Sequence, residues 1–120
     1  HHPLLGQCAQ IHKMARLLQL FEIYGVTAYF AGHNHVLQYK APGKFSPVAQ
    51  FISGAGSKTG TACEGGDWGM PKGTFGFLRV TVRHEDKSEF EFIDATTLDN
   101  PGGDSVYTAI VNASSYWYPK

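Results

Sequence analysis

The chain has 120 residues, about one small domain, and its 42% hydrophobic and 17% charged residues are typical of a globular protein rather than a disordered one. Lysine plus arginine equals aspartate plus glutamate, at ten each, so the net charge is zero. This balance argues against a protein that binds nucleic acid by neutralising its phosphates, and we expect no nucleic-acid partner. No apolar run reaches transmembrane length, so no membrane partner is expected either.

The first predicted element is a helix over about residues 9–24. Apolar residues recur there at three- and four-residue spacing, and charged residues gather on the opposite side. The apolar stripe consists of Ile11, Met14, Leu18 and Phe21, widened by Leu17, Leu20 and Tyr24. Gly25 is predicted to end the helix, because glycine tolerates the left-handed conformation of a helix C-cap.

Three short strands are expected next, at residues 26–31, 36–40 and 47–53. Each is rich in β-branched or aromatic residues, and each is followed by glycine or proline within a few residues. Residues 57–73 contain several glycines, together with Trp68 and Pro71, and this composition predicts a long loop with little regular structure. A loop of this length is either functional or an ordinary surface excursion.

Residues 74–83 and 88–95 are predicted to form an antiparallel pair, joined by a turn at residues 84–87. Phe90 and Phe92 alternate with Glu89 and Glu91, which is typical of a strand with one buried face. A last strand is expected at residues 106–111.

A helix that leads straight into a strand, followed mostly by β structure, is typical of the second half of a βαβ unit. The first strand of that unit would precede His1. We therefore expect an α/β fold in which residues 1–120 are the C-terminal part of a single domain whose N-terminal part is absent.

The motif Gly32-His33-Asn34-His35 directly follows the first predicted strand. Two histidines at i and i+2 after a strand can point into one crevice, and sites collect at the carboxyl ends of strands in open α/β folds. Neutral imidazole is a common ligand of zinc, iron and similar ions. The pattern favours a metal site, whereas the alternative for such histidines is an ordinary surface or hydrogen-bonded core position.

His1-His2-Pro3 precedes the helix and so is expected at the mouth of the strand before it. Adjacent parallel strands would bring His1 or His2 near His33 and His35. The sequence therefore predicts a three-histidine cluster at one edge of a sheet. The alternative interpretation of His1-His2 is the remnant of a purification tag.

The stretch from Tyr24 to His35 resembles the last metal motif of the calcineurin-like metallophosphoesterases, and most of all the mammalian-type, tartrate-resistant purple acid phosphatases. Ser53-Gly54-Ala55-Gly56 is similar to a segment found one strand later in that family. The Phe-rich strand pair at residues 74–95 is similar to the family's terminal sheet. His1-His2-Pro3 resembles the family's Gly-His-x-Pro motif without its glycine. The resemblance covers residues 1 to about 96 and is closest at residues 24–56.

The resemblance implies a fold and a set of ligands. The fold is a four-layer αββα metallophosphoesterase sandwich, of which this chain would supply one helix followed by mostly β-strands. His1 and His33 match ligands of a divalent metal ion, and His35 matches a ligand of a ferric ion. The implied cofactors are Fe(III) plus Fe, Zn or Mn. His2 occupies the variable position of its motif, where it lines the substrate pocket or serves only for packing.

The family's other ligands lie in motifs of the N-terminal half, which is therefore an expected partner, and no catalytic acid or base is assigned in this chain. Cys8 does not fall where the family places its helix cysteine. Cys8 and Cys63 are thus left to pair with each other, to pair with a missing segment, or to stay free. Asn112-Ala113-Ser114 matches the N-glycosylation acceptor pattern, which together with the family implies a secreted or lysosomal glycoprotein.

The implied function is the hydrolysis of phosphate monoesters at acid pH by a dinuclear metal centre. The isolated chain is expected to be inactive because the remaining ligands come from elsewhere. The alternatives within the superfamily are a phosphodiesterase or a nucleotidase. A different alternative is a non-catalytic pseudo-phosphatase fragment, and the blandest is an ordinary β-rich domain whose histidines are incidental.

Overall fold

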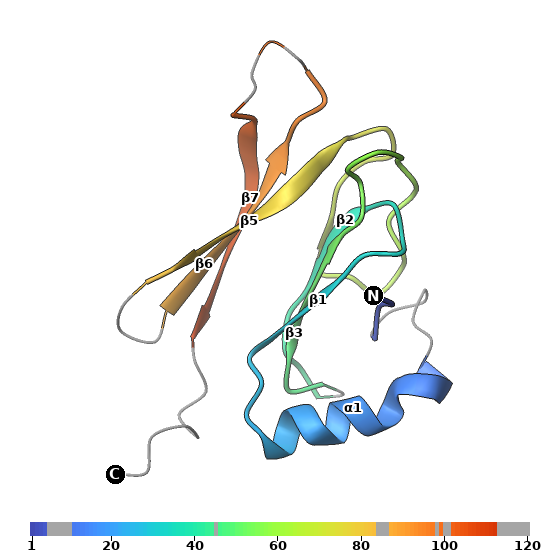
Figure 1. Cartoon of the computed structure of the whole chain (residues 1–120), viewed down its shortest axis with the longest axis vertical. Coiled ribbons are helices and arrows are strands. Elements are labelled where there is room, and N and C mark those ends of the chain that lie inside the picture. The colour runs from blue at the N-terminus through green and yellow to red at the C-terminus, as the bar shows by residue number, and fades with distance from the viewer. Residues whose placement is uncertain (5–10, 45, 84–86, 98, 100–101, 113–120) are drawn as a thin grey trace.

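The computed structural model describes residues 1–4, 11–44, 46–83, 87–97, 99 and 102–112 (Figure 1). They form one helix and two β-sheets, so the chain is a small mixed α/β domain. The helix, α1, spans Ile11–Ile23 and confirms the predicted helix over its described part, whereas residues 9 and 10 lie outside the described residues. Within the described residues, no helix is long and apolar enough to cross a membrane.

The end of α1 is a Schellman motif built on Gly25, which has a positive φ of 60°. The Gly25 amide donates to the carbonyl oxygen of Glu22 at 3.3 Å, and the Val26 amide donates to that of Phe21 at 2.9 Å. These two bonds satisfy carbonyl groups that the helix itself leaves without partners. The predicted helix stop at Gly25 is confirmed.

A four-stranded sheet follows the helix, with the strand order β1-β3-β2-β4. Its strands are β1 (Ala28–Ala31), β2 (Leu37–Lys40), β3 (Ala49–Ser53) and β4 (Trp68–Gly69). β1 runs parallel to β3, and β2 runs antiparallel to both β3 and β4. The three strands predicted in this region are confirmed, and each begins one or two residues later than expected.

The prediction of a long loop at residues 57–73 is wrong at one point, because this segment contains the short strand β4. This strand has only two residues, Trp68 and Gly69, which pair with Tyr39 and Gln38. Two residues are too few to show an alternating pattern. The pairing instead depends on contacts with β2, far away in the sequence.

A separate three-stranded sheet has the order β5-β6-β7 and is antiparallel throughout. Its strands are β5 (Gly76–Val82), β6 (Lys87–Asp94) and β7 (Asp104–Asn112). The predicted antiparallel pair and the predicted last strand are both confirmed. The turn predicted between β5 and β6 falls mainly on residues 84–86, which lie outside the described residues.

The two sheets pack face to face through aromatic rings. Phe51 of β3 is fully buried and stacks on Phe90 of β6, with ring centroids 4.4 Å apart and planes 15° from parallel. Trp68 of β4 stacks on Tyr107 of β7 at 4.6 Å. The buried core between the sheets consists of Leu37, Tyr39, Ala49, Phe51, Ala55, Met70, Phe90, Phe92 and Ala109. Aromatic pairs of this kind stabilise a core beyond the area that they bury.

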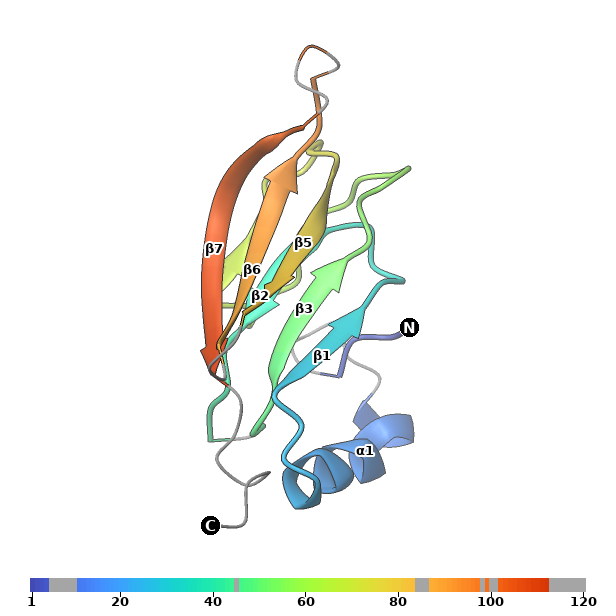
Figure 2. The same cartoon turned by 60° about the vertical axis from the view of Figure 1, so that its left-hand side comes forward.

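Helix α1 lies on the other side of the four-stranded sheet, as Figures 1 and 2 show. Phe21 of the helix contacts Tyr29 of β1, with ring centroids 5.6 Å apart. Beside them lies a small apolar cluster of Ala31, Val36 and Ile52. The described residues therefore form three layers, in the order helix, sheet, sheet.

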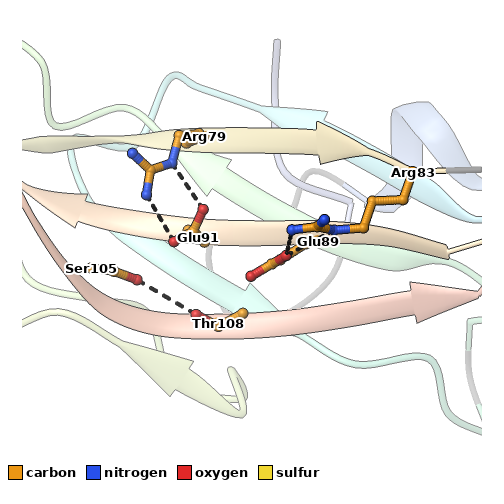
Figure 3. A network of polar contacts seen from close by, with 6 residues as sticks. All are labelled: Arg79, Arg83, Glu89, Glu91, Ser105 and Thr108. Carbon is orange, nitrogen blue, oxygen red and sulfur yellow. Dashed lines mark hydrogen bonds and ion pairs between the residues drawn. The ribbon is translucent and has the colours of Figure 1, made fainter.

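The outer face of the three-stranded sheet carries two ion pairs (Figure 3). The Arg79 guanidinium donates two hydrogen bonds of 2.8 Å to the Glu91 carboxylate, and Arg83 donates to Glu89. The hydrogen bond from Arg79 lowers the pKa of the Glu91 carboxyl below its ordinary value. Exposed pairs of this kind contribute little to stability, and no helix of the described residues covers them.

The inter-sheet core predicts a large difference between two substitutions, one in each sheet. Phe51→Ala removes a fully buried ring from the centre of the core and should lower the free energy of unfolding by about 3–5 kcal/mol. Val82→Ala, at a side chain that is 80% exposed, should change it by less than about 0.5 kcal/mol. Urea denaturation measures both, and equal losses would contradict the assignment of the core.

Candidate functional site

Two loops meet at the carboxyl edge of β1 and β3. Because these strands are parallel, with Ala31 opposite Ile52, the residues that follow them emerge at the same end of the sheet. One loop is the histidine turn, residues 32–36, and the other begins at Ser53-Gly54. In the histidine turn the Asn34 amide donates to the Gly32 carbonyl oxygen at 2.6 Å. This edge is where sites collect in open α/β sheets.

His33 has a backbone φ of 57°, and it is the only non-glycine residue in the described part of the chain with a positive φ. A side chain in this left-handed region costs backbone energy and persists only where the surroundings hold it in place. The imidazole of His33 contacts the rings of His1 and His2, with centroids 5.2 Å and 4.1 Å apart. The left-handed conformation and the contacts with two other histidines make His33 a candidate functional residue.

His1 is joined to the histidine turn through its backbone. Its carbonyl oxygen accepts a hydrogen bond from the Gly32 amide at 2.9 Å. The His1 ring lies over Gly32, so a methyl group at that position would come within 3.6 Å of its Nδ1 atom. The predicted proximity of His1 to His33 is confirmed.

His2 lies against both His1 and His33, and its Nδ1 atom is buried. Its carbonyl oxygen accepts a hydrogen bond of 2.9 Å from the Tyr29 hydroxyl, and burial raises the pKa of that hydroxyl. Two residues on, the Leu4 amide donates to the Gln50 side chain at 2.6 Å. The segment 1–4 is thus fastened to both β1 and β3.

His35 is placed differently from the other predicted ligands. It is exposed, as His1 and His33 are, but the ring contacts among the described residues join His1, His2 and His33 and not His35. Its carbonyl oxygen accepts a hydrogen bond of 2.6 Å from the Gly60 amide. The predicted cluster therefore forms with His2 in the place expected for His35.

The histidines provide some of the donor atoms that a metal site requires. Imidazole nitrogen is a suitable donor for zinc and iron, and His1 and His33 are close enough to act together. Among the described residues, however, no group of three or more His, Cys, Asp or Glu side chains has an arrangement that could hold a metal ion. The residues fit part of a metal site and do not complete one.

Gly54 explains why a glycine stands beside the histidine turn. A Cβ atom at this position would overlap the carbonyl oxygen of Asn34, so the second loop approaches the turn more closely than any side chain allows. The Gly54 amide also donates to the Val36 carbonyl oxygen at 3.0 Å. The Ser-Gly-Ala-Gly segment is therefore part of the support of the site.

The contact between Cys63 and the site was not predicted from the sequence. Cys63 is disulfide-bonded, so the alternative of a free Cys63 is wrong, and the chain's other cysteine, Cys8, lies outside the described residues. The Asn34 side-chain amide donates to the Cys63 Sγ atom at 3.1 Å. An even number of cysteines was the one signal available, and it carries no information about the contact with Asn34.

The whole-sequence comparisons add no relatives: no protein-family model matches the chain, and no curated protein matches it.

A pair of glycine substitutions tests the close approach of the two loops. Gly54→Ala should lower the free energy of unfolding by about 1–3 kcal/mol and shift the amide NMR signals of Asn34 and His35, because the new methyl group displaces the turn. Gly56→Ala is the matched control, since a Cβ there meets nothing within 4 Å. Equal behaviour of the two variants in denaturation and NMR would contradict the packing described here.

Proposed function

We propose that this chain is the C-terminal part of a metallophosphoesterase domain of the purple acid phosphatase type, a phosphoric monoester hydrolase. The observation that carries the proposal is the contact between the rings of His1 and His33 at the carboxyl end of β1, with His33 held in a left-handed conformation. It supports the metal-ligand roles that the resemblance gives to these two histidines. The sheet-on-sheet core with a helix on one face is also compatible with three of the four layers of the αββα sandwich.

The proposal gives the histidines three roles. His1 and His33 would hold the divalent ion, and His35 would hold the ferric ion. His2, which packs on His33 and keeps its Nδ1 atom buried, would line the substrate pocket. Gly54 supports the backbone between His33 and His35, because only a glycine there lets the second loop approach Asn34 so closely.

The metals would be Fe(III) with Fe, Zn or Mn, and when bound they would supply charge to bind the phosphate and to activate a water. In this proposal the site is shared, and the N-terminal half of the domain supplies the remaining ligands, as the family resemblance implies. We accordingly propose that the isolated chain is inactive. A secreted or lysosomal location with a glycan on Asn112, the last residue of β7, belongs to the same proposal.

The activity test uses the chain joined to the N-terminal part of its reading frame. The joined protein should hydrolyse an aryl phosphate monoester at acid pH and should act poorly on the corresponding diester. His33→Asn should lower kcat/KM by roughly 100-fold or more, because loss of a ligand costs at least as much as loss of the groups that support one. Asparagine is chosen because it tolerates the left-handed backbone of His33, so the variant removes the imidazole without adding strain.

Lys72→Ala, at an exposed loop position, is the control that should leave activity unchanged. Unchanged turnover in His33→Asn would defeat the proposal. Preference for the diester would instead favour a phosphodiesterase, and a folded protein with no activity on either substrate would favour a non-catalytic relative.

A further inference from the structure

The loop formed by residues 54–70 lies along the histidine turn and is fastened to it by the backbone. The Gly54 amide donates to the Val36 carbonyl oxygen, and the Gly60 amide donates to the His35 carbonyl oxygen at 2.6 Å. These two bonds lie at the last two residues of the turn, directly before β2 begins at Leu37. The loop is therefore hydrogen-bonded directly to the backbone of His35.

Cys63 attaches the same loop to β2 through Gln38. The Cys63 amide donates to Oε1 of Gln38 at 3.2 Å, and Nε2 of Gln38 donates to the Cys63 carbonyl oxygen. The Gln38 side chain is buried, at a position where a strand would ordinarily carry an apolar residue. Both polar ends of this buried amide are satisfied by one residue of the loop, which makes the contact specific.

Asn34 makes the second side-chain contact with Cys63. It lies between His33 and His35, and its Nδ2 atom donates to the Cys63 Sγ atom at 3.1 Å. The sulfur of Cys63 is itself held by a disulfide bond. A covalently restrained atom thus contacts the residue between two proposed metal ligands.

Glycine allows the loop to pack this closely. A Cβ atom at Gly66 would overlap the side-chain amide of Gln38, and one at Gly69 would lie 2.8 Å from the Cβ atom of Ala62. The loop therefore follows Gln38 with no space for side chains at these points. The backbone on the C-terminal side of Cys63 is therefore closely packed against Gln38 and Ala62.

From these contacts we propose that Asn34 and Gln38 are positioning residues, which fasten the disulfide-bonded Cys63 to the histidine turn and thereby fix the orientation of His33 and His35. The role as support for a metal site rests on the proposed function, whereas the restraint on the turn does not. Reduction of the disulfide releases the sulfur from its covalent restraint. In that step a dithiol is oxidised to its disulfide, the sulfur–sulfur bond breaks, and each cysteine sulfur takes up one proton.

The first experiment measures amide hydrogen exchange at Gly60 and Gly54 by NMR in this chain. Gln38→Met removes both hydrogen bonds to Cys63 and keeps an unbranched side chain of similar length. It should accelerate exchange at Gly60 by about fivefold or more. This is the effect expected if the opening of the Gly60–His35 bond becomes easier by about the contribution of one hydrogen bond. Gln19→Met, at an exposed position of α1, is the matched control and should leave exchange at Gly60 unchanged.

Treatment of the unsubstituted chain with a dithiol should accelerate exchange at Gly60 in the same way. Asn34→Ala should accelerate it in the absence of a dithiol. Unchanged exchange at Gly60 in both Gln38→Met and the reduced chain would overturn the proposal. Equal acceleration throughout the four-stranded sheet would also overturn it, because that result indicates only a general loss of stability.

The second experiment measures zinc binding by the chain joined to its N-terminal part. Gln38→Met should raise the half-saturating zinc concentration by roughly 10- to 100-fold, as expected when a ligand loses its support. Faster exchange at Gly60 with unchanged zinc affinity would overturn the positioning role. Absence of zinc binding in the unsubstituted protein would instead overturn the proposed function. Hydrogen exchange at Gly60 would then be the sole test of whether the contacts of Cys63 restrain the histidine turn.

Discussion

Parallel pairing between β1 and β3 places the chain segments that follow both strands at one edge of the four-stranded sheet. The histidine turn leaves β1 there, and the loop that begins at Gly54 leaves β3 beside it. Their separation is so small that only glycine fits at position 54. The loop carrying Cys63 and the first residues of the chain are hydrogen-bonded to the histidine turn, and His33 lies within that turn.

The strand that sets this edge also anchors the rest of the fold. Phe51 of β3 stacks on Phe90 across the interface between the sheets, whereas Gln50, on the opposite face of β3, holds the amide of Leu4. Alternation of side chains along one strand thus connects the inter-sheet core with the segment that carries His1 and His2. The core is dominated by stacked rings, and these fix the distance and direction of the second sheet.

Much of this architecture could be predicted from local patterns. The apolar stripe and Gly25 defined α1 and its end, and the alternation around Phe90 and Phe92 defined the three-stranded sheet. The proximity of His1 to His33 followed from the expected parallel order of strands. The helix and the three-stranded sheet depend on periodicity or on a single residue's conformational preference, which can be read from neighbouring residues. The proximity of His1 to His33 depends instead on the expected order of the strands.

The remainder depends on contacts between distant residues. The two-residue strand β4, the bonds from Gln38 to Cys63 and the place of His2 in the ring cluster have no counterpart in local sequence, because register and loop path determine them. The proposed dinuclear metal site is tested most directly by the metal content of the chain joined to its proposed N-terminal part, measured by elemental analysis. The proposed site predicts two metal ions per joined molecule, including iron, and at most one on this chain alone. No bound metal in the joined protein would contradict it and leave a non-catalytic relative.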